Sequence, residues 1–162
     1  MNEENTHFLY PAALFVSHEP YRVSTILGSC VAVCLHDPIL CVGGINHFML
    51  PFWNGQGLAS PKYGNIAIER LVERMLAMGC KKYNLQAKVF GGGEVIETSN
   101  KQFNIGDRNI QIAYELLEEA CISVVAKSVG GKLGRKIEFL SHSGEVKQRY
   151  IEHSKVASYR LQ

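Results

Sequence analysis

The sequence lacks the features that mark membrane, secreted and nucleic-acid-binding proteins. No apolar run approaches the roughly 20 residues that a membrane-spanning helix needs. Residues 1–6 are polar and acidic, without the basic start and apolar stretch of a signal peptide. Neither sign of charge dominates, because 17 lysines and arginines stand against 15 aspartates and glutamates. We therefore expect a protein that binds no nucleic acid and inserts into no membrane.

A disulfide framework is also missing from the pattern of cysteines. Five cysteines, an odd number, are scattered along the chain at Cys30, Cys34, Cys41, Cys80 and Cys121. A chain of this length does not need disulfides to fold, so the thiols are expected to be reduced. Reduced thiols and the missing signal peptide together predict a cytoplasmic location.

What the chain does contain is typical of an ordinary globular domain. Hydrophobic residues make up 46% of its 162 residues and charged residues 20%, which is enough to build a core without metals or disulfides. No internal repeat, linker or low-complexity segment divides it. Since a typical domain has roughly 100–150 residues, residues 1–162 are expected to form a single domain.

The hydrophobic pattern predicts an α/β fold. Short apolar or alternating runs predict strands at 8–16, 21–27, 31–35, 40–49, 84–90, 121–127, 137–140 and 146–151. One helix is expected to begin with Ser60 as N-cap and Pro61 at its first position, and to end at Gly79. A second helix is expected at about 106–120. The fold class is thus α/β, with mixed, largely antiparallel sheets and two main helices.

A turn signal between two predicted strands brings a cysteine close to a histidine. Asp37 and Pro38 suit the first two positions of a type I turn. If residues 37–40 close this hairpin symmetrically, Cys30 lies directly opposite His47, with Cβ atoms about 4.5–5.5 Å apart. A bulge or a wider loop would shift this register.

The same alternation separates a core face from a candidate reactive face of the hairpin. Cys30 and His47 share one face, which is mixed in character. The other face is apolar and is expected to be core. Its members are Val31, Val33, Leu35, Val42 and Phe48.

A thiol beside an imidazole is the arrangement that nucleophilic catalysis requires. The imidazole takes the thiol proton and the resulting ion pair keeps the thiolate. A third group usually orients the imidazole, and the nearest upstream hydroxyls are those of Ser24 and Thr25. From residue types alone, Cys30 and His47 also fit two inert core residues, so both interpretations stay open at this point.

A turn before the cysteine completes the candidate site. Gly28 and Ser29 can turn the chain so that an upstream hydroxyl reaches the site. Backbone N–H groups at this turn are also placed to bind a developing oxyanion.

Other motifs have a simpler structural interpretation. Cys34, His36 and Cys41 would share the face of Cys30, but their spacing matches no standard zinc pattern, so no metal is expected. The glycines at 91–93 and 130–131 do not have the spacing of a phosphate-binding loop. They are expected to be turns that need positive φ or a close approach of backbone near the site.

Five separated motifs are shared with a known family. They lie at residues 27–33, 47–51, 88–92, 105–109 and 130–137. In this order they resemble the chemoreceptor glutamine deamidases of bacterial chemotaxis, the CheD family. The resemblance extends from about residue 21 to residue 150.

The resemblance implies a catalytic triad and a fold. Cys30 and His47 fall on the family's nucleophile and base. The family's hydroxyl lies six residues before the cysteine, at Ser24 in this chain, and the adjacent Thr25 is the alternative. The implied fold is a layered α/β sandwich similar to the deamidating domains of certain bacterial toxins.

The resemblance also implies a reaction and its partners. A Cys30 thioester would form on a receptor glutamine, release ammonia and then be hydrolysed to glutamate, without any cofactor. The substrates would be methyl-accepting chemotaxis receptors. Receptor methylesterase activity would be a second reaction, and a CheC-type phosphatase a regulatory partner.

Two other functions compete with protein-glutamine deamidation. The first is a non-catalytic regulator that binds a CheC-type phosphatase, in which Cys30 and His47 would be dispensable. The second is a cysteine hydrolase or transglutaminase-like enzyme that acts on another acyl substrate.

Overall fold

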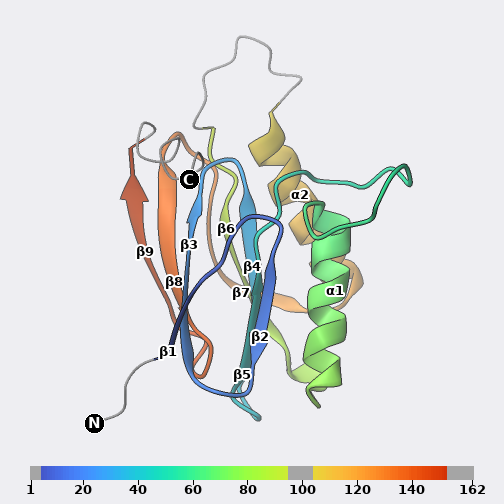
Figure 1. Ribbon diagram of the computed structural model, residues 1–162, viewed down its shortest axis with the longest axis vertical. Helices are drawn as coiled ribbons and strands as arrows, with labels where there is room; N and C mark the ends of the chain where they lie inside the picture. Colours follow the sequence, from blue (N-terminus) through green and yellow to red (C-terminus); the bar gives the residue numbers. More distant parts are fainter. Residues whose placement is uncertain (1–4, 95–103, 153–162) are drawn as a thin grey trace.

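The computed structural model describes residues 5–94 and 104–152, which are arranged in three layers (Figure 1). A four-stranded sheet packs against a five-stranded sheet, and two helices cover the far side of the five-stranded sheet. The predicted α/β class with mixed, largely antiparallel sheets and two main helices is confirmed. In the described part of the chain, no helix is long and apolar enough to span a membrane.

The four-stranded sheet has the order β1-β3-β8-β9. Its strands are β1 (Asn5–Phe8), β3 (Tyr21–Leu27), β8 (Gly134–Leu140) and β9 (Val146–Ile151). β1 runs parallel to β3, and the remaining pairs are antiparallel. The predicted closing hairpin is β8–β9, and Gly144 in its turn has a φ of 79°.

The five-stranded sheet has the order β2-β5-β4-β6-β7. Its strands are β2 (Leu14–Ser17), β4 (Val31–Asp37), β5 (Val42–Asn46), β6 (Gln86–Gly91) and β7 (Ser123–Val129). β6 and β7 are parallel, and the other neighbours are antiparallel. β4 is central and buried along its whole length, because the other sheet covers one of its faces and the helices cover the other.

The helices are α1 (Gly64–Ala77) and α2 (Ile105–Glu119), and a short 3₁₀ turn, Lys82–Asn84, precedes β6. Both α1 and α2 present an apolar face to the five-stranded sheet, as the spacing of their apolar residues requires. The buried apolar residues of these faces are Ala67, Ile68, Leu71, Met75, Ala113 and Leu117.

Two hydrophobic clusters separate the faces of β4. The predicted core residues Val31, Val33, Leu35, Val42 and Phe48 all lie in the cluster between the sheet and the helices, which confirms that face. On the opposite face, Ala32 and Cys34 of β4, and Cys30 directly before it, lie in the cluster between the two sheets. The candidate nucleophile is therefore placed in the space between the sheets, at one end of β4.

A single strand over 8–16 is a wrong prediction. β1 and β2 belong to different sheets, and the chain crosses between them at a turn where Ala12 has a φ of 67°. Of residues 8–16, Phe8 ends β1 and 14–16 belong to β2, while 9–13 form the crossing. The apolar run gives no signal for the crossing because partner sheets are chosen by tertiary contacts.

The predicted start of the first helix at Ser60 is also wrong, whereas its end before Gly79 is confirmed. The backbone carbonyl of Ser60 accepts a hydrogen bond from Tyr63 N, so 60–63 is a turn that precedes the helix. At the true helix start, Gly64 N donates to Leu50 O at 2.7 Å. A long-range carbonyl therefore takes over part of the role expected of a capping side chain.

Candidate active site

The hairpin that carries Cys30 and His47 has a wider loop than the symmetric turn over 37–40. Asp37 pairs with Val42, so the register differs from the predicted one by two residues. The Asp37 side chain accepts hydrogen bonds from Ile39 N and Leu40 N and holds this wider loop. The prediction that Cys30 lies directly opposite His47 is therefore wrong.

The correct register still leaves both residues on one face. A bridge between Val31 and Phe48 continues the pairing of β4 and β5, which sets His47 opposite Ala32. Cys30 is then the diagonal neighbour of His47, at a separation of roughly 7–8 Å between the two Cα atoms and less between the Cβ atoms. A shift of two residues preserves the face because side chains alternate with a period of two.

An asparagine side chain interrupts the backbone ladder directly beside His47. Val33 N donates to the side-chain Oδ1 of Asn46 at 2.8 Å. In a regular antiparallel ladder, this N–H would bond to the backbone carbonyl of the opposed residue. The interruption lies between two intact stretches of the ladder, next to the pair formed by Ala32 and His47.

The hydroxyl that contacts His47 belongs to Thr25 of β3, across the space between the sheets. Thr25 Oγ1 lies 2.6 Å from His47 Nδ1 and 2.7 Å from the carbonyl oxygen of Leu9. Thr25 is fully buried and His47 is 2% exposed, so water does not compete for these contacts.

The two contacts of Thr25 determine which ring nitrogen of His47 carries a proton. A carbonyl oxygen only accepts hydrogen bonds, so the single hydroxyl proton of Thr25 is donated to Leu9 O. The Thr25 oxygen must then accept from His47, which requires a proton on Nδ1. In the neutral ring this leaves the lone pair on Nε2.

Ser24, the first candidate for the orienting hydroxyl, faces the other way. Val23 and Leu27 of β3 lie in the cluster between the sheets, and Thr25 is buried with them. Because successive side chains point to opposite faces, Ser24 projects from the outer face of the four-stranded sheet. The geometry therefore favours Thr25 over Ser24 as the neighbour of His47.

The crossing between β1 and β2 closes over the pair of Thr25 and His47. Leu9 O accepts the Thr25 hydrogen bond, and Ala12 N donates to His47 O at 2.8 Å. Leu9 was not singled out from the sequence, because a backbone carbonyl has no residue-type signal.

Gly28 and Ser29 form the link by which the chain passes from β3 in one sheet to β4 in the other. Gly28 O accepts a hydrogen bond from Gly93 N at 2.9 Å. This link is therefore held by Gly93, which lies just after the end of β6.

The glycine segment 91–93 approaches the backbone of Cys30 closely, as predicted. Gly92 N donates to Cys30 O at 2.8 Å. Gly91 has a φ of 107°, and a Cβ atom on it would collide with Cys30 O. On the other side, Gly92 packs against the backbone of Gly106 in α2. Gly91 and Gly92 belong to the motif at 88–92, and Gly106 belongs to the motif at 105–109. Both motifs therefore need glycine because backbone segments approach each other closely beside Cys30.

Asn109 of α2 also reaches the backbone around the cysteine. Its Nδ2 donates to Ser29 O and to Met49 O, both at 3.0 Å. These carbonyls flank the candidate pair, one residue before Cys30 and two residues after His47. Asn109 lies in the shared motif at residues 105–109, but nothing in the sequence indicated this contact.

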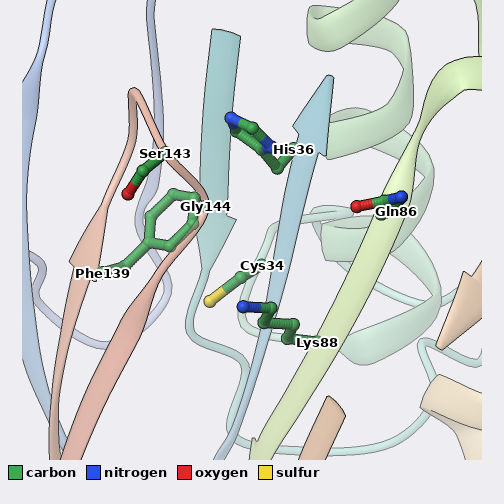
Figure 2. Close-up of a pocket in the computed structure, with 7 residues that line it drawn as sticks. All are labelled: Cys34, His36, Gln86, Lys88, Phe139, Ser143 and Gly144. Carbon is green, nitrogen blue, oxygen red and sulfur yellow. The ribbon is translucent and has the colours of Figure 1, made fainter. Parts of the chain in front are cut away.

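A second cysteine on the same face of β4 lies in a different setting. Cys34 lines a small recess of about 40 Å³ together with His36 and Lys88. Figure 2 shows the sulfur of Cys34 and the amino group of Lys88 directed to the same side of this recess. Burial nevertheless raises the pKa of the Cys34 thiol far above its ordinary range, and Lys88 offsets only part of this.

The side chains considered for zinc do not form a metal site. His36 Nε2 lies 2.7 Å from His142 O, and Cys41 lies in the loop between β4 and β5. Within residues 5–94 and 104–152, no group of three or more His, Cys, Asp and Glu side chains is arranged to hold a metal ion. None of the five cysteines, all of which are in the described residues, forms a disulfide.

Comparison with known proteins shows the family that this chain resembles. Residues 49–150 match the family model described as CheD chemotactic sensory transduction. This match contains the glycine segment and Asn109 but begins after Cys30 and His47.

Curated relatives extend the similarity further. A protein of Trichlorobacter lovleyi named "Probable chemoreceptor glutamine deamidase CheD" is 54% identical over 140 residues, covering 86% of this chain and 87% of the relative. A protein of the same name from Sulfurimonas denitrificans is 46% identical over 156 residues, covering 93% and 97%. Another, from Rhodospirillum rubrum, is 41% identical and covers 90% and 82%. The chain therefore belongs to the CheD family of chemotaxis proteins.

Proposed function

We propose that this protein is a chemoreceptor glutamine deamidase that converts receptor glutamine side chains to glutamate and releases ammonia. The observation that carries the proposal is the buried Thr25–His47 contact on the face that also holds Cys30. The names of the family's curated members supply the substrate class.

Acylation begins at the cysteine. His47 Nε2, which holds the lone pair in the tautomer that Thr25 selects, takes the proton of the Cys30 thiol. The thiolate attacks the carboxamide carbon of the glutamine and forms a tetrahedral intermediate. His47 then returns the proton to the departing nitrogen, ammonia leaves, and a thioester remains on Cys30.

Deacylation uses the same residues. His47 takes a proton from water, and the resulting hydroxide adds to the thioester carbon. The carbon–sulfur bond breaks, His47 returns its proton to the Cys30 sulfur, and the new carboxyl group ionises to glutamate. The Nδ1–H bond to Thr25 is retained when the ring is charged, so Thr25 stabilises the imidazolium that forms in both halves of the reaction.

The link between the sheets is the proposed oxyanion site. Backbone N–H groups at Gly28 and Ser29 lie directly before the nucleophile in the chain, and the link is fixed by Gly93 and Asn109. Donors fixed in advance stabilise a developing negative charge without reorganising during the reaction.

Three finer features belong to the same proposal. The thioester route would also hydrolyse receptor glutamyl methyl esters, because the same carbonyl carbon is attacked. A thiol nucleophile must stay reduced, which supports a cytoplasmic location for the reaction. A CheC-type phosphatase remains the proposed regulatory partner.

The test uses purified protein and a cytoplasmic fragment of a methyl-accepting chemotaxis receptor. We expect ammonia release, and a mass gain on a receptor peptide equal to the exchange of NH₂ for OH. Cys30→Ala is expected to abolish both while its circular dichroism and melting temperature stay close to those of the wild type. Full activity of Cys30→Ala would refute the proposal. A different mass change would indicate another acyl substrate.

The non-catalytic alternative is separated by the same variant. In an assay with a CheC-type phosphatase, Cys30→Ala should still alter phosphatase activity if the protein acts only as a binding partner. Loss of deamidation with retained binding would show that binding does not need the Cys30 thiol.

A further inference from the structure

Asn109 is a buried amide that connects two backbone segments of the candidate site. It is fully buried in α2, and its Nδ2 donates to the carbonyl oxygens of Ser29 and Met49. Ser29 directly precedes the nucleophile, and Met49 follows His47 by two residues. One side chain therefore holds the backbone on both sides of the proposed Cys30–His47 pair.

The chemistry of the contacts determines the orientation of this amide. Both neighbours are carbonyl oxygens, which only accept hydrogen bonds, so the NH₂ group must face them. The amide oxygen points elsewhere, is buried, and has no hydrogen-bond partner among the described residues. Leaving a buried oxygen unsatisfied destabilises the fold. The NH₂ group, with its two hydrogen bonds, is therefore the part of Asn109 that acts on the site.

The position of α2 makes Asn109 a rigid tether. Gly106, one turn earlier in the helix, packs against the backbone of Gly92, which in turn donates a hydrogen bond to Cys30 O. Asn109 thus acts from a helix fixed to the same glycine segment that holds the cysteine. Sites held by regular elements are more exact than sites held by loops alone.

We propose that Asn109 is a positioning residue that sets the separation of Cys30 and His47 through the backbone of Ser29 and Met49. This inference rests on the proposed function and deepens it. Asn109 does not touch the substrate, because its oxygen is sealed from solvent and its NH₂ group is occupied by the two carbonyls. Val31 and Phe48 stay paired without Asn109, so its loss frees only the backbone beyond that pair, at Ser29 and Met49, and this lengthens the path of the thiol proton.

Two variants of similar size test the tether. Asn109→Leu removes two hydrogen bonds but also the unsatisfied oxygen, so its melting temperature is expected to fall only modestly. Asn109→Asp keeps the shape but lacks the NH₂ group, and serves if the leucine variant does not fold. For either folded variant we expect kcat to fall about 10- to 100-fold with KM within about twofold, the effect of misplacing reacting groups without changing substrate binding.

A second measurement needs no receptor. The rate of Cys30 alkylation by iodoacetamide, followed at the level of the peptide by mass spectrometry, reports how well His47 activates the thiol. We expect this rate to fall in parallel with kcat in both variants. Asn104→Ala is the matched control, because Asn104 accepts a hydrogen bond from Asp107 N at the start of the same helix. It should lower the melting temperature while leaving both kcat and the alkylation rate unchanged.

The outcomes separate this inference from the function on which it rests. Wild-type kcat and alkylation rates in folded Asn109→Leu or Asn109→Asp, with Cys30→Ala inactive, would overturn the tether and leave the deamidase proposal standing. Full deamidation by Cys30→Ala would instead overturn the function. An activity loss in Asn109→Leu that merely follows a loss of stability, as judged against Asn104→Ala, would also overturn the tether.

Discussion

Two cysteines on one face of β4, Cys30 and Cys34, differ in almost everything except residue type and burial. Cys30 is 4% exposed and Cys34 is 1% exposed, and both belong to the cluster between the sheets. At the Cys34 end, burial raises the pKa of the thiol, and the charge of Lys88 offsets only part of this. A thiol that stays protonated is a poor nucleophile.

The Cys30 end is built from long-range contacts. His47 comes from the next strand, Thr25 from the other sheet, and Asn109 from a helix. Cys34 shares the burial and the strand face of Cys30, so neither property distinguishes the proposed nucleophile. What distinguishes Cys30 is the set of polar groups that other elements bring to it.

The largest expected effect compares the two thiols directly. Cys30→Ala should lower deamidation by at least about 1,000-fold, because removal of a nucleophile leaves only the remaining parts of the site. Cys34→Ala should stay within about threefold of wild type and lose about 1 kcal/mol of stability for the small cavity. Initial rates of ammonia release and urea denaturation measure both. Comparable losses of activity in the two variants would contradict the distinction.

The next effect tests which hydroxyl orients the imidazole. Thr25→Val removes the hydroxyl but keeps the shape, so His47 loses the acceptor that selects its tautomer. We expect kcat to fall about 10- to 100-fold, a part of what general acid–base catalysis contributes. Ser24→Ala, on the outer face of the sheet, should change kcat less than twofold. A larger loss in Ser24→Ala than in Thr25→Val would reverse the assignment.

A third effect concerns the glycine segment at the Cys30 end. Gly91→Ala places a methyl group against Cys30 O at a φ of 107°, and should destabilise the fold by roughly 3–5 kcal/mol. Gly130→Ala has a similar positive φ of 78° but open space around it. It should cost only about 1–2 kcal/mol for the left-handed backbone. Urea denaturation of both variants checks this, and equal costs would show that the close approach to Cys30 is not a constraint.

The smallest effect is a pH dependence of stability from the buried, protonated thiols. Burial raises the pKa of Cys34, and burial together with the Asp37 carboxyl group raises that of Cys80 to about 11. Between the ordinary thiol pKa and these raised values, the folded state binds more protons than the unfolded state. The free energy of unfolding therefore falls as pH rises from about 8.5.

The measurement for this last prediction is urea denaturation at several pH values from neutral to alkaline. Cys34→Ala should show a shallower decline than wild type, by no more than about 1.4 kcal/mol per pH unit. An unchanged slope in this variant would mean that the Cys34 thiol is not held protonated by the fold.

Several elements were predictable because their signal is local. The faces of β4 follow from alternation, the β8–β9 hairpin from its turn residues, and the end of α1 from Gly79. The start of α1 was not predictable, because its first N–H group bonds to the carbonyl of Leu50 rather than to a local capping residue.

The sequence predicted that Cys30 and His47 share a face, but not which residue lies opposite each of them. The alternation of side chains put Cys30 and His47 on one face, and a register error of two residues left that result intact. The same argument gave the wrong cross-strand partner, because the loop after Asp37 is wider than a symmetric turn over 37–40.

By itself, the sequence determined the family motifs, the two faces of β4, and the side of the sheet that Cys30 and His47 share. Only the tertiary structure decided that Thr25 rather than Ser24 contacts His47, and that Asn109 holds the backbone beside both residues. The physical reason is that alternation fixes on which side of a strand a residue lies. Which residue it meets there depends on the packing of sheets and helices that are distant in sequence.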